Sequence, residues 1–173
     1  TILALLHHPY LRDQFAGADV ALFELACMRG ARPSGGVGAL PAAIAALRKD
    51  EFHRSDRREQ FGDAEWDRAA EVARRLSEML APLIALSLGD HDFLAFAQAH
   101  SLALSAAIAE DSVDCTEMRA AMDALIEAGS DAPLMTLADY AESFPSFIRE
   151  HTLRPARAEN ERLRILGPLE ARM

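Results

Sequence analysis

Apolar residues along the chain recur at intervals of three and four, the spacing that places side chains on one face of an α-helix. The longest such stripe follows Asp63 and consists of Trp66, Ala69, Ala73, Leu76, Leu80 and Leu83. A second stripe, on a helix predicted at 91–109, consists of Phe93, Phe96, Ala97, His100, Leu104 and Ala107. Because Leu94, Leu102 and Ile108 widen this second apolar surface, we expect its helix to lie at the centre of the core.

The same periodicity predicts further helices, separated by glycine, proline and polar residues that end helices. Their expected ranges are 2–8, 19–30, 41–49, 114–129, 136–143 and 145–153. Asp19 and Asp90 are expected to be N-caps, and the pair Thr136 and Asp139 has capping-box spacing, as does the pair Asp114 and Glu117. Two prolines are expected to set helix boundaries. Pro82 should kink or divide the helix that begins at residue 63, and Pro145 should lie in the first turn of the helix at 145–153.

Composition agrees with this helical pattern. The 173 residues include 34 Ala and 23 Leu against 15 Val, Ile and Thr together, a bias that favours helices over a large sheet. The chain is long enough to bury a core without disulfides. We therefore predict an all-α, irregular multi-helix bundle of about seven to eight helices. Near the C-terminus, a polar linker at 155–161 is followed by a short strand-like apolar segment and the start of a helix, within 162–173.

Charge is unevenly distributed. The net charge is −9, and the segment 90–142 holds 11 acids and one base, so the chain as a whole is not a nucleic-acid coat. The segment 48–59 has five bases and four acids, and the tail 149–173 has six arginines and four acids. If DNA is contacted, these two segments are the expected places. No apolar run approaches the roughly 18 residues that span a bilayer.

Residues that could carry chemistry are few and scattered. His91 and His100 lie nine positions apart, which puts them on opposite faces of one helix and prevents them from sharing a metal ion there. His91 is expected in an exposed first turn and His100 in the core. Cys27 is expected to be a buried apolar residue, and Cys115 lies among acids that raise a thiol pKa. A metal hydrolase is therefore the least favoured interpretation, and neither a cofactor nor a catalytic residue is expected within this chain.

Both ends of the chain resemble one family. LALLHHPYLR at residues 3–12, LACMRGARPSGGVGAL at 25–40 and RLRILGPLEARM at 162–173 resemble segments of the AddB family of double-strand break repair proteins, in the UvrD/RecB helicase superfamily. The last segment resembles the strand, loop and helix that re-enter the second RecA-like helicase domain. Active helicases there have Thr-x-His and Lys-Gly-Leu-Glu, whereas this chain keeps only the Leu-Glu at Leu169 and Glu170.

The resemblance implies a helical insertion, of the kind called domain 2B, at 1–161 and a stub of the second RecA-like domain at 162–173. It implies a cytoplasmic parent protein that works with an AddA-like helicase and nuclease subunit in resecting DNA ends, without a membrane. ATP, magnesium and an iron–sulfur cluster would belong to other parts of that parent, and motor activity is in doubt because the His and Lys-Gly are missing.

Six residues of the tail are candidate contacts with DNA or with the helicase core, because guanidinium groups bind phosphates and carboxylates bidentately. They are Arg154, Arg157, Arg162, Arg164, Glu170 and Arg172. Solvation and ion pairs with Glu159 and Glu161 are the alternative role for these arginines. The alternative for the whole chain is a free-standing helical module that binds a basic partner through the acidic surface of 90–142.

Overall fold

The structure is a computed structural model that describes residues 2–12, 14–29, 34–108, 113–128 and 133–149, with the side chains of 12, 113–115 and 128 left out. These residues form an all-α fold, as predicted, and contain no strand. The elements are α1 (Ile2–Leu6), α2 (Pro9–Arg12), α3 (Gly17–Phe23), the π-helix η1 (Glu24–Met28), the 3₁₀-helix η2 (Val37–Ala39), α4 (Leu40–Leu47), the 3₁₀-helix η3 (Arg57–Gln60), α5 (Asp63–Met79), α6 (Ala81–Ala85), α7 (Phe93–Ala107), α8 (Val113–Ala128) and α9 (Leu137–Ile148).

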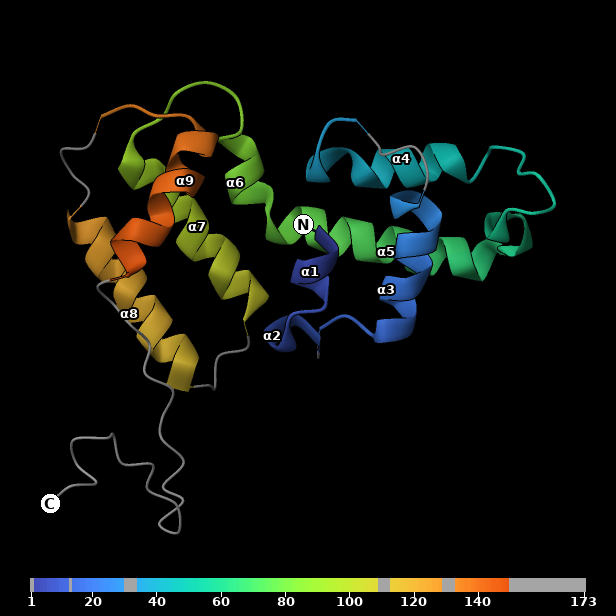
Figure 1. The fold of residues 1–173 in the computed structure, drawn as a ribbon, viewed down its shortest axis with the longest axis horizontal. Coiled ribbons are helices and arrows are strands. Elements are labelled where there is room, and N and C mark those ends of the chain that lie inside the picture. Colours follow the sequence, from blue (N-terminus) through green and yellow to red (C-terminus); the bar gives the residue numbers. More distant parts are fainter. Residues whose placement is uncertain (1, 13, 30–33, 109–112, 129–132, 150–173) are drawn as a thin grey trace, which may run out of the picture.

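Helix α5 is the central helix of the first half of the molecule, and α3 and α4 pack along it (Figure 1). Four residues of the predicted stripe are buried on α5, together with Val72 and Met79: Trp66, Ala69, Ala73 and Leu76. The other two, Leu80 and Leu83, lie beyond the end of α5 and are only half-buried. Phe23 of α3 and Ile44 of α4 complete this first core cluster. Buried residues of the segments 3–12 and 25–40 also belong to this cluster, among them Leu6, Leu11 and Cys27.

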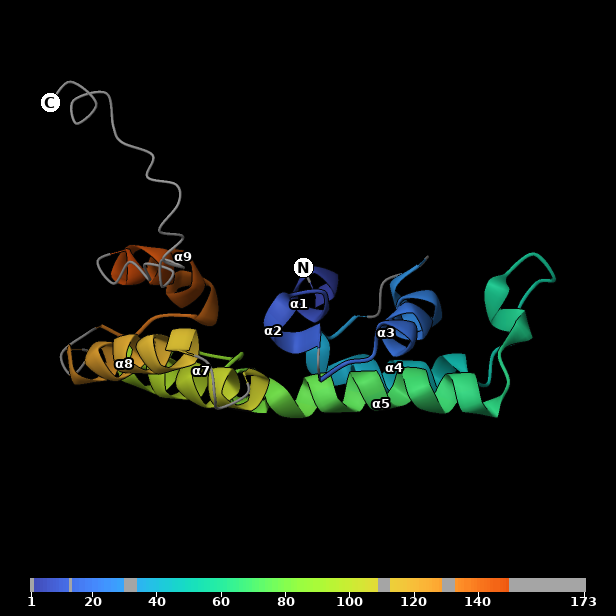
Figure 2. The same ribbon diagram turned by 90° about the horizontal axis from the view of Figure 1, so that it is seen from below.

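Helices α7, α8 and α9 enclose a second core cluster in the other half of the molecule. Figure 2 shows α7 and α8 side by side in one layer, with α9 above them. Phe93 and Phe96 of α7 meet Met122 of α8 and Tyr140 of α9, and all four side chains are buried. Among the residues that the structure describes, no buried residue belongs to both clusters.

A polar junction joins the two halves. The side-chain amide of Gln14 donates a hydrogen bond of 2.7 Å to the carbonyl of Ala107, at the C-terminal end of α7. The carbonyl of Gln14 accepts a 2.7 Å hydrogen bond from the guanidinium of Arg75 on α5. Ala107 itself belongs to the first cluster, while Phe96 belongs to the second. Helix α7 therefore spans both clusters.

Two predicted N-caps are wrong. Helix α3 begins after Ala16, and Asp19 lies in its first turn with its carboxylate directed to Arg68. The cap of α7 is Asp92, whose side chain accepts a 2.6 Å hydrogen bond from the amide of Ala95, rather than Asp90. An isolated antiparallel bridge between His91 and Met135 holds the chain extended before α7 and delays the start of the helix.

Pro82 and Pro145 have different effects on the helices around them. Pro82 divides the predicted long helix, because α5 ends at Met79 and α6 begins at Ala81. Pro145, predicted to begin a new helix, instead lies inside α9. A proline there leaves the carbonyl of residue 141 without its helical partner, and both Pro145 and Ala141 are exposed, so water can satisfy that carbonyl.

Helix α7 is central in position, but its apolar surface is not wholly buried. Leu102, expected to widen the core-facing surface, is 62% exposed, and Leu94 is half-buried. Ile108 packs against the first cluster as expected. The hydrophobic face of α7 is therefore narrower than the sequence predicts, and one of its leucines faces solvent.

Candidate functional site

The six predicted contact residues of the tail lie outside the described residues, as do the linker 155–161 and the strand-like segment that follows it. Arg154, Arg157, Arg162, Arg164, Glu170 and Arg172 therefore stay predictions. Helix α8 begins at Val113, so Asp114 is its second residue and not its N-cap as predicted, and the side chain of Asp114 is not described. In the described residues, chemistry could reside in pockets, buried polar groups or exposed surfaces.

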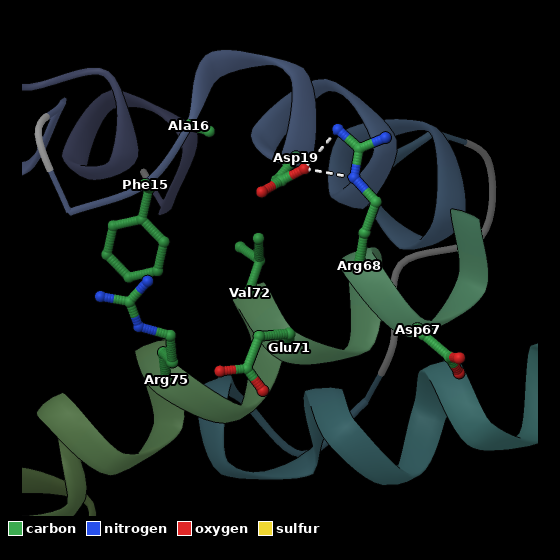
Figure 3. Close-up of a pocket in the computed structure, with 8 residues that line it drawn as sticks. All are labelled: Phe15, Ala16, Asp19, Asp67, Arg68, Glu71, Val72 and Arg75. Carbon is green, nitrogen blue, oxygen red and sulfur yellow. Dashed lines mark hydrogen bonds and ion pairs between the residues drawn. The ribbon is translucent and has the colours of Figure 1, made fainter. Parts of the chain in front are cut away.

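A pocket of about 240 Å³ opens between the start of α3 and the middle of α5 (Figure 3). The pocket is lined by Phe15, Ala16, Asp19, Asp67, Arg68, Glu71, Val72 and Arg75. Its α5 residues come from the polar margin of the helix, beside the buried stripe, so that Val72 lies between charged neighbours. Sequence reasoning missed this pocket, because its two walls are about fifty residues apart and only the folded chain brings them together.

The charged groups of the pocket already have partners. Arg68 donates a 2.6 Å hydrogen bond from Nε to Asp19, as the dashed lines of Figure 3 show. Arg75 binds the carbonyl of Gln14 and holds its guanidinium 4.8 Å from the centre of the Phe15 ring. The other two carboxylates of the pocket turn to arginines outside it, Asp67 to Arg48 and Glu71 to Arg74. A hydrogen bond from Arg74 lowers the pKa of Glu71, which suits an ion pair rather than a general base.

A second candidate is the pair His100 and Tyr140 in the second core cluster. The Nδ1 atom of His100 lies 3.1 Å from the hydroxyl of Tyr140, within hydrogen-bond distance, and its ring lies 4.4 Å from that of Phe144. Burial lowers the pKa of His100 and raises the pKa of Tyr140. Both groups are therefore neutral near pH 7, and the expectation of a satisfied core histidine is confirmed.

Cys27 and His91 also make local contacts with backbone carbonyls. Cys27 is buried beside the carbonyl of Phe23, 3.4 Å away, and burial raises its thiol pKa to about 12, so the thiolate nucleophile is absent at neutral pH. His91 precedes α7 and is half-buried, not in an exposed helical turn; its Nε2 lies 3.1 Å from the carbonyl of Leu88. The side chain of Cys115 lies outside the described residues.

Metal binding finds no support in the described part of the chain. Within it, no three His, Cys, Asp or Glu side chains are grouped closely enough to hold a metal ion. His91 and His100 contact different groups, a backbone carbonyl and a tyrosine hydroxyl.

Two of the five bases in segment 48–59, Arg48 and Arg58, form ion pairs within the protein. Arg48 bridges Asp63 and Asp67 with two contacts of 2.6 Å and so fastens the end of α4 to the start of α5. Arg58 pairs with Asp56 in the same segment. Three bases of this segment are exposed: Lys49, Arg54 and Arg57. The loop that follows α4 lies at the end of the molecule far from α9 (Figure 1).

The carboxylates of α8, in the acidic segment 90–142, differ from the bases of segment 48–59 in their ion pairing. The ion pairs shown within the described residues all lie between residues 19 and 78, so none involves the carboxylates of α8. Glu117, Asp123 and Glu127 are exposed on the outer side of this helix. Among the helices described, none is both long and apolar enough to pass through a membrane.

Comparisons of the chain with protein families, with curated proteins and with solved structures found no match. The arrangement of the chain's own residues and the resemblance of its two ends are therefore the basis for a function.

Proposed function

We propose that the chain is a non-catalytic helical domain of an AddB-like helicase and nuclease subunit that acts in double-strand break resection. The observation that carries this proposal is the resemblance of residues 3–12, 25–40 and 162–173 to that family, together with the all-α fold that the resemblance implies. ATP, magnesium and any iron–sulfur cluster would be bound by other parts of the complex.

The packing around α5 supports a scaffolding role. Asp19 ties α3 to Arg68 of α5, and Arg48 ties the end of α4 to the first turn of the same helix. Each exposed ion pair contributes little to stability alone, but together the pairs fix the directions in which α3 and α4 leave α5. A domain that shapes a DNA channel needs helices held in fixed positions rather than an activated side chain.

In this proposal the tail arginines carry the contacts with nucleic acid. A guanidinium group binds a phosphate through two hydrogen bonds and gives affinity without base specificity. Because the rest of the chain is acidic and only a few arginines are available, we expect weak DNA binding with a modest salt dependence, whose slope of log K against log salt is about 0.9 for each phosphate bound.

Co-purification with an AddA-like subunit from the same organism tests the assignment directly. The expected result is a stoichiometric complex, and no association at micromolar concentration of both proteins would contradict the proposal. DNA binding is measured separately by fluorescence anisotropy on duplex DNA across a salt series. Replacing Arg154, Arg157, Arg162 and Arg164 by Ala should lower the slope of log K against log salt by up to about 0.9 for each phosphate that the variant no longer binds.

Arg54→Ala with Arg57→Ala is the control for charge loss, and it is compared with the pair Arg162→Ala and Arg164→Ala, which removes the same number of charges from the tail. These two side chains are exposed in the first half of the molecule, so the pair removes positive charge without touching the tail. If this control weakens DNA binding as much as the tail variant does, the tail is not the contact surface. Tight DNA binding with little salt dependence would contradict the scaffolding role, because a few arginine–phosphate contacts give only weak, salt-dependent affinity and tight binding would need other contacts with the DNA.

The exposed carboxylates of α8 favour one second candidate, a free-standing module that binds a basic partner. Glu117, Asp123 and Glu127 lack an ion pair in the described residues and could each meet a Lys or Arg. Reversing these three charges to Lys should abolish binding of a basic partner but leave an AddA-like complex formed elsewhere intact. The co-purification experiment, repeated with this variant, separates the two candidates.

A further inference from the structure

We propose that the pocket between α3 and α5 binds a small zwitterion, an amino acid with an aliphatic side chain. In this proposal Asp19 binds the ammonium group of the ligand, Arg75 binds its carboxylate, and Phe15 and Val72 contact its side chain. The inference goes beyond the proposed function and does not depend on it.

The base of the pocket is apolar and small. Phe15 and Val72 line it, each is 3% exposed, and both belong to the first core cluster. The volume of about 240 Å³ is below the roughly 300–1,000 Å³ of pockets that hold drug-sized ligands. The pocket therefore suits a ligand that has a short apolar part and few atoms.

Asp19 offers this pocket a carboxylate oxygen that the protein itself does not use. Arg68 reaches Asp19 through Nε and Nη2, and both contacts go to the same oxygen, Oδ1. Figure 3 shows the other oxygen directed away from Arg68, over Val72. Among the described residues the structure gives Oδ2 no partner, so it can accept a charge-assisted hydrogen bond from an ammonium group.

Arg75 offers hydrogen-bond donors to the same pocket. A guanidinium group has five N–H groups, and within the described residues the structure shows one from Arg75, which donates to the carbonyl of Gln14. The ring of Phe15 lies 4.8 Å from the guanidinium carbon and holds the group in place without using its N–H groups (Figure 3). Both partners are uncharged, and no ion pair of the described residues includes Arg75. The remaining donors can bind a carboxylate.

The charges around the pocket favour a zwitterion over an anion or an amine. Three carboxylates and two guanidinium groups line it: Asp19, Asp67, Glu71, Arg68 and Arg75. A ligand with only a negative charge is repelled by the three carboxylates, and a ligand with only a positive charge is repelled by the two arginines. A zwitterion adds no net charge and gives both Asp19 and Arg75 an oppositely charged partner.

An NMR titration of the isotope-labelled full chain with leucine tests the proposal. We expect saturable shifts of amides in the first turn of α3 and the middle of α5, with a Kd of about 0.1–5 mM because the ligand is small. Isocaproate and isoamylamine are leucine without its amino group and without its carboxylate, respectively. Each should bind at least about tenfold more weakly, because it loses one charge-assisted hydrogen bond.

Two results with the wild-type chain would overturn the proposal. One is the absence of shifts in α3 and α5 at about 20 mM leucine, well above the expected Kd. The other is binding of isocaproate or isoamylamine as tight as that of leucine, because a single charge would then be sufficient. Neither result depends on a variant that has to fold.

Variants then locate the site. Asp19→Asn and Arg75→Gln should each weaken leucine binding at least about tenfold. Asp56→Asn and Arg58→Gln are the matched controls, because Asp56 and Arg58 also form an ion pair and Arg58 also lies over an aromatic ring, that of Phe52, outside the pocket. Circular dichroism should show the same helix content in all four. Equal weakening by the controls would overturn the assignment of the ligand to this pocket.

Discussion

The hydrogen-bonded pair His100 and Tyr140 makes stability depend on pH. Burial lowers the pKa of His100 in the folded protein, whereas in the unfolded chain the imidazole has an ordinary pKa near 6.5. Above that pH both states are neutral and the full stability is present. Below it the unfolded chain binds the proton more readily, so the free energy of unfolding falls by at most about 1.4 kcal/mol per pH unit from this one group.

Urea unfolding of the wild type and of His100→Gln, between pH 7.5 and 5, measures this contribution. Gln keeps a polar side chain near the Tyr140 hydroxyl but does not titrate, so the variant should lose stability less steeply as pH falls. The absolute stability of the variant does not matter, because the readout is the difference between two slopes. Parallel slopes would show that His100 is protonated equally in both states.

At the scale of the helix, the capping box at the N-terminus of α9 is the best-defined local interaction. The hydroxyl of Thr136 accepts a hydrogen bond from the amide of Asp139, and the Asp139 carboxylate accepts one from the amide of Thr136. Thr136→Ala removes half of this exchange and should cost about 1 kcal/mol in the free energy of unfolding. Thr116→Ala, on the exposed side of α8, is the control and should be neutral or slightly stabilising, because Ala is the better helix former.

Elements whose signals are local were predictable from the sequence. The stripe from Trp66 to Leu76 is buried as its spacing requires, and the Thr136 box caps α9 as predicted. These predictions succeed because three- and four-residue spacing and capping chemistry depend only on neighbours along the chain.

Features that depend on distant residues were not predictable. Asp19 resembles an N-cap in sequence, but an arginine 49 residues away draws its carboxylate into an ion pair. Asp90 loses its expected cap role because Met135 pairs with His91 and extends the chain. Leu102 fits an apolar stripe, yet which side of that stripe is covered depends on where α8 and α9 lie. The pocket beside Arg75 escaped prediction for the same reason.

At the scale of the molecule, two core clusters share one connecting helix. The first cluster surrounds α5 and the second lies between α7, α8 and α9. Besides the chain itself, the connection includes Ala107 and Ile108 packing on the first cluster and the Gln14 side chain bound to the end of α7. Helix α6 adds to it, because it packs on α7 and on η2. Clusters joined in this way can open separately, because each buries its own apolar residues.

Native-state hydrogen exchange with two matched core variants tests this division. Leu76 and Met122 are each about fully buried, at 0% and 1% exposure, in the first and second clusters respectively. Replacing either by Ala should cost roughly 2–5 kcal/mol, because the variant buries less apolar surface and leaves a residual cavity. We expect Leu76→Ala to lower the protection of amides in α3, α4 and α5 by that amount and those in α8 and α9 by much less, and Met122→Ala to do the reverse. Equal losses of protection throughout would show that the connection through α7 makes the two clusters one cooperative unit.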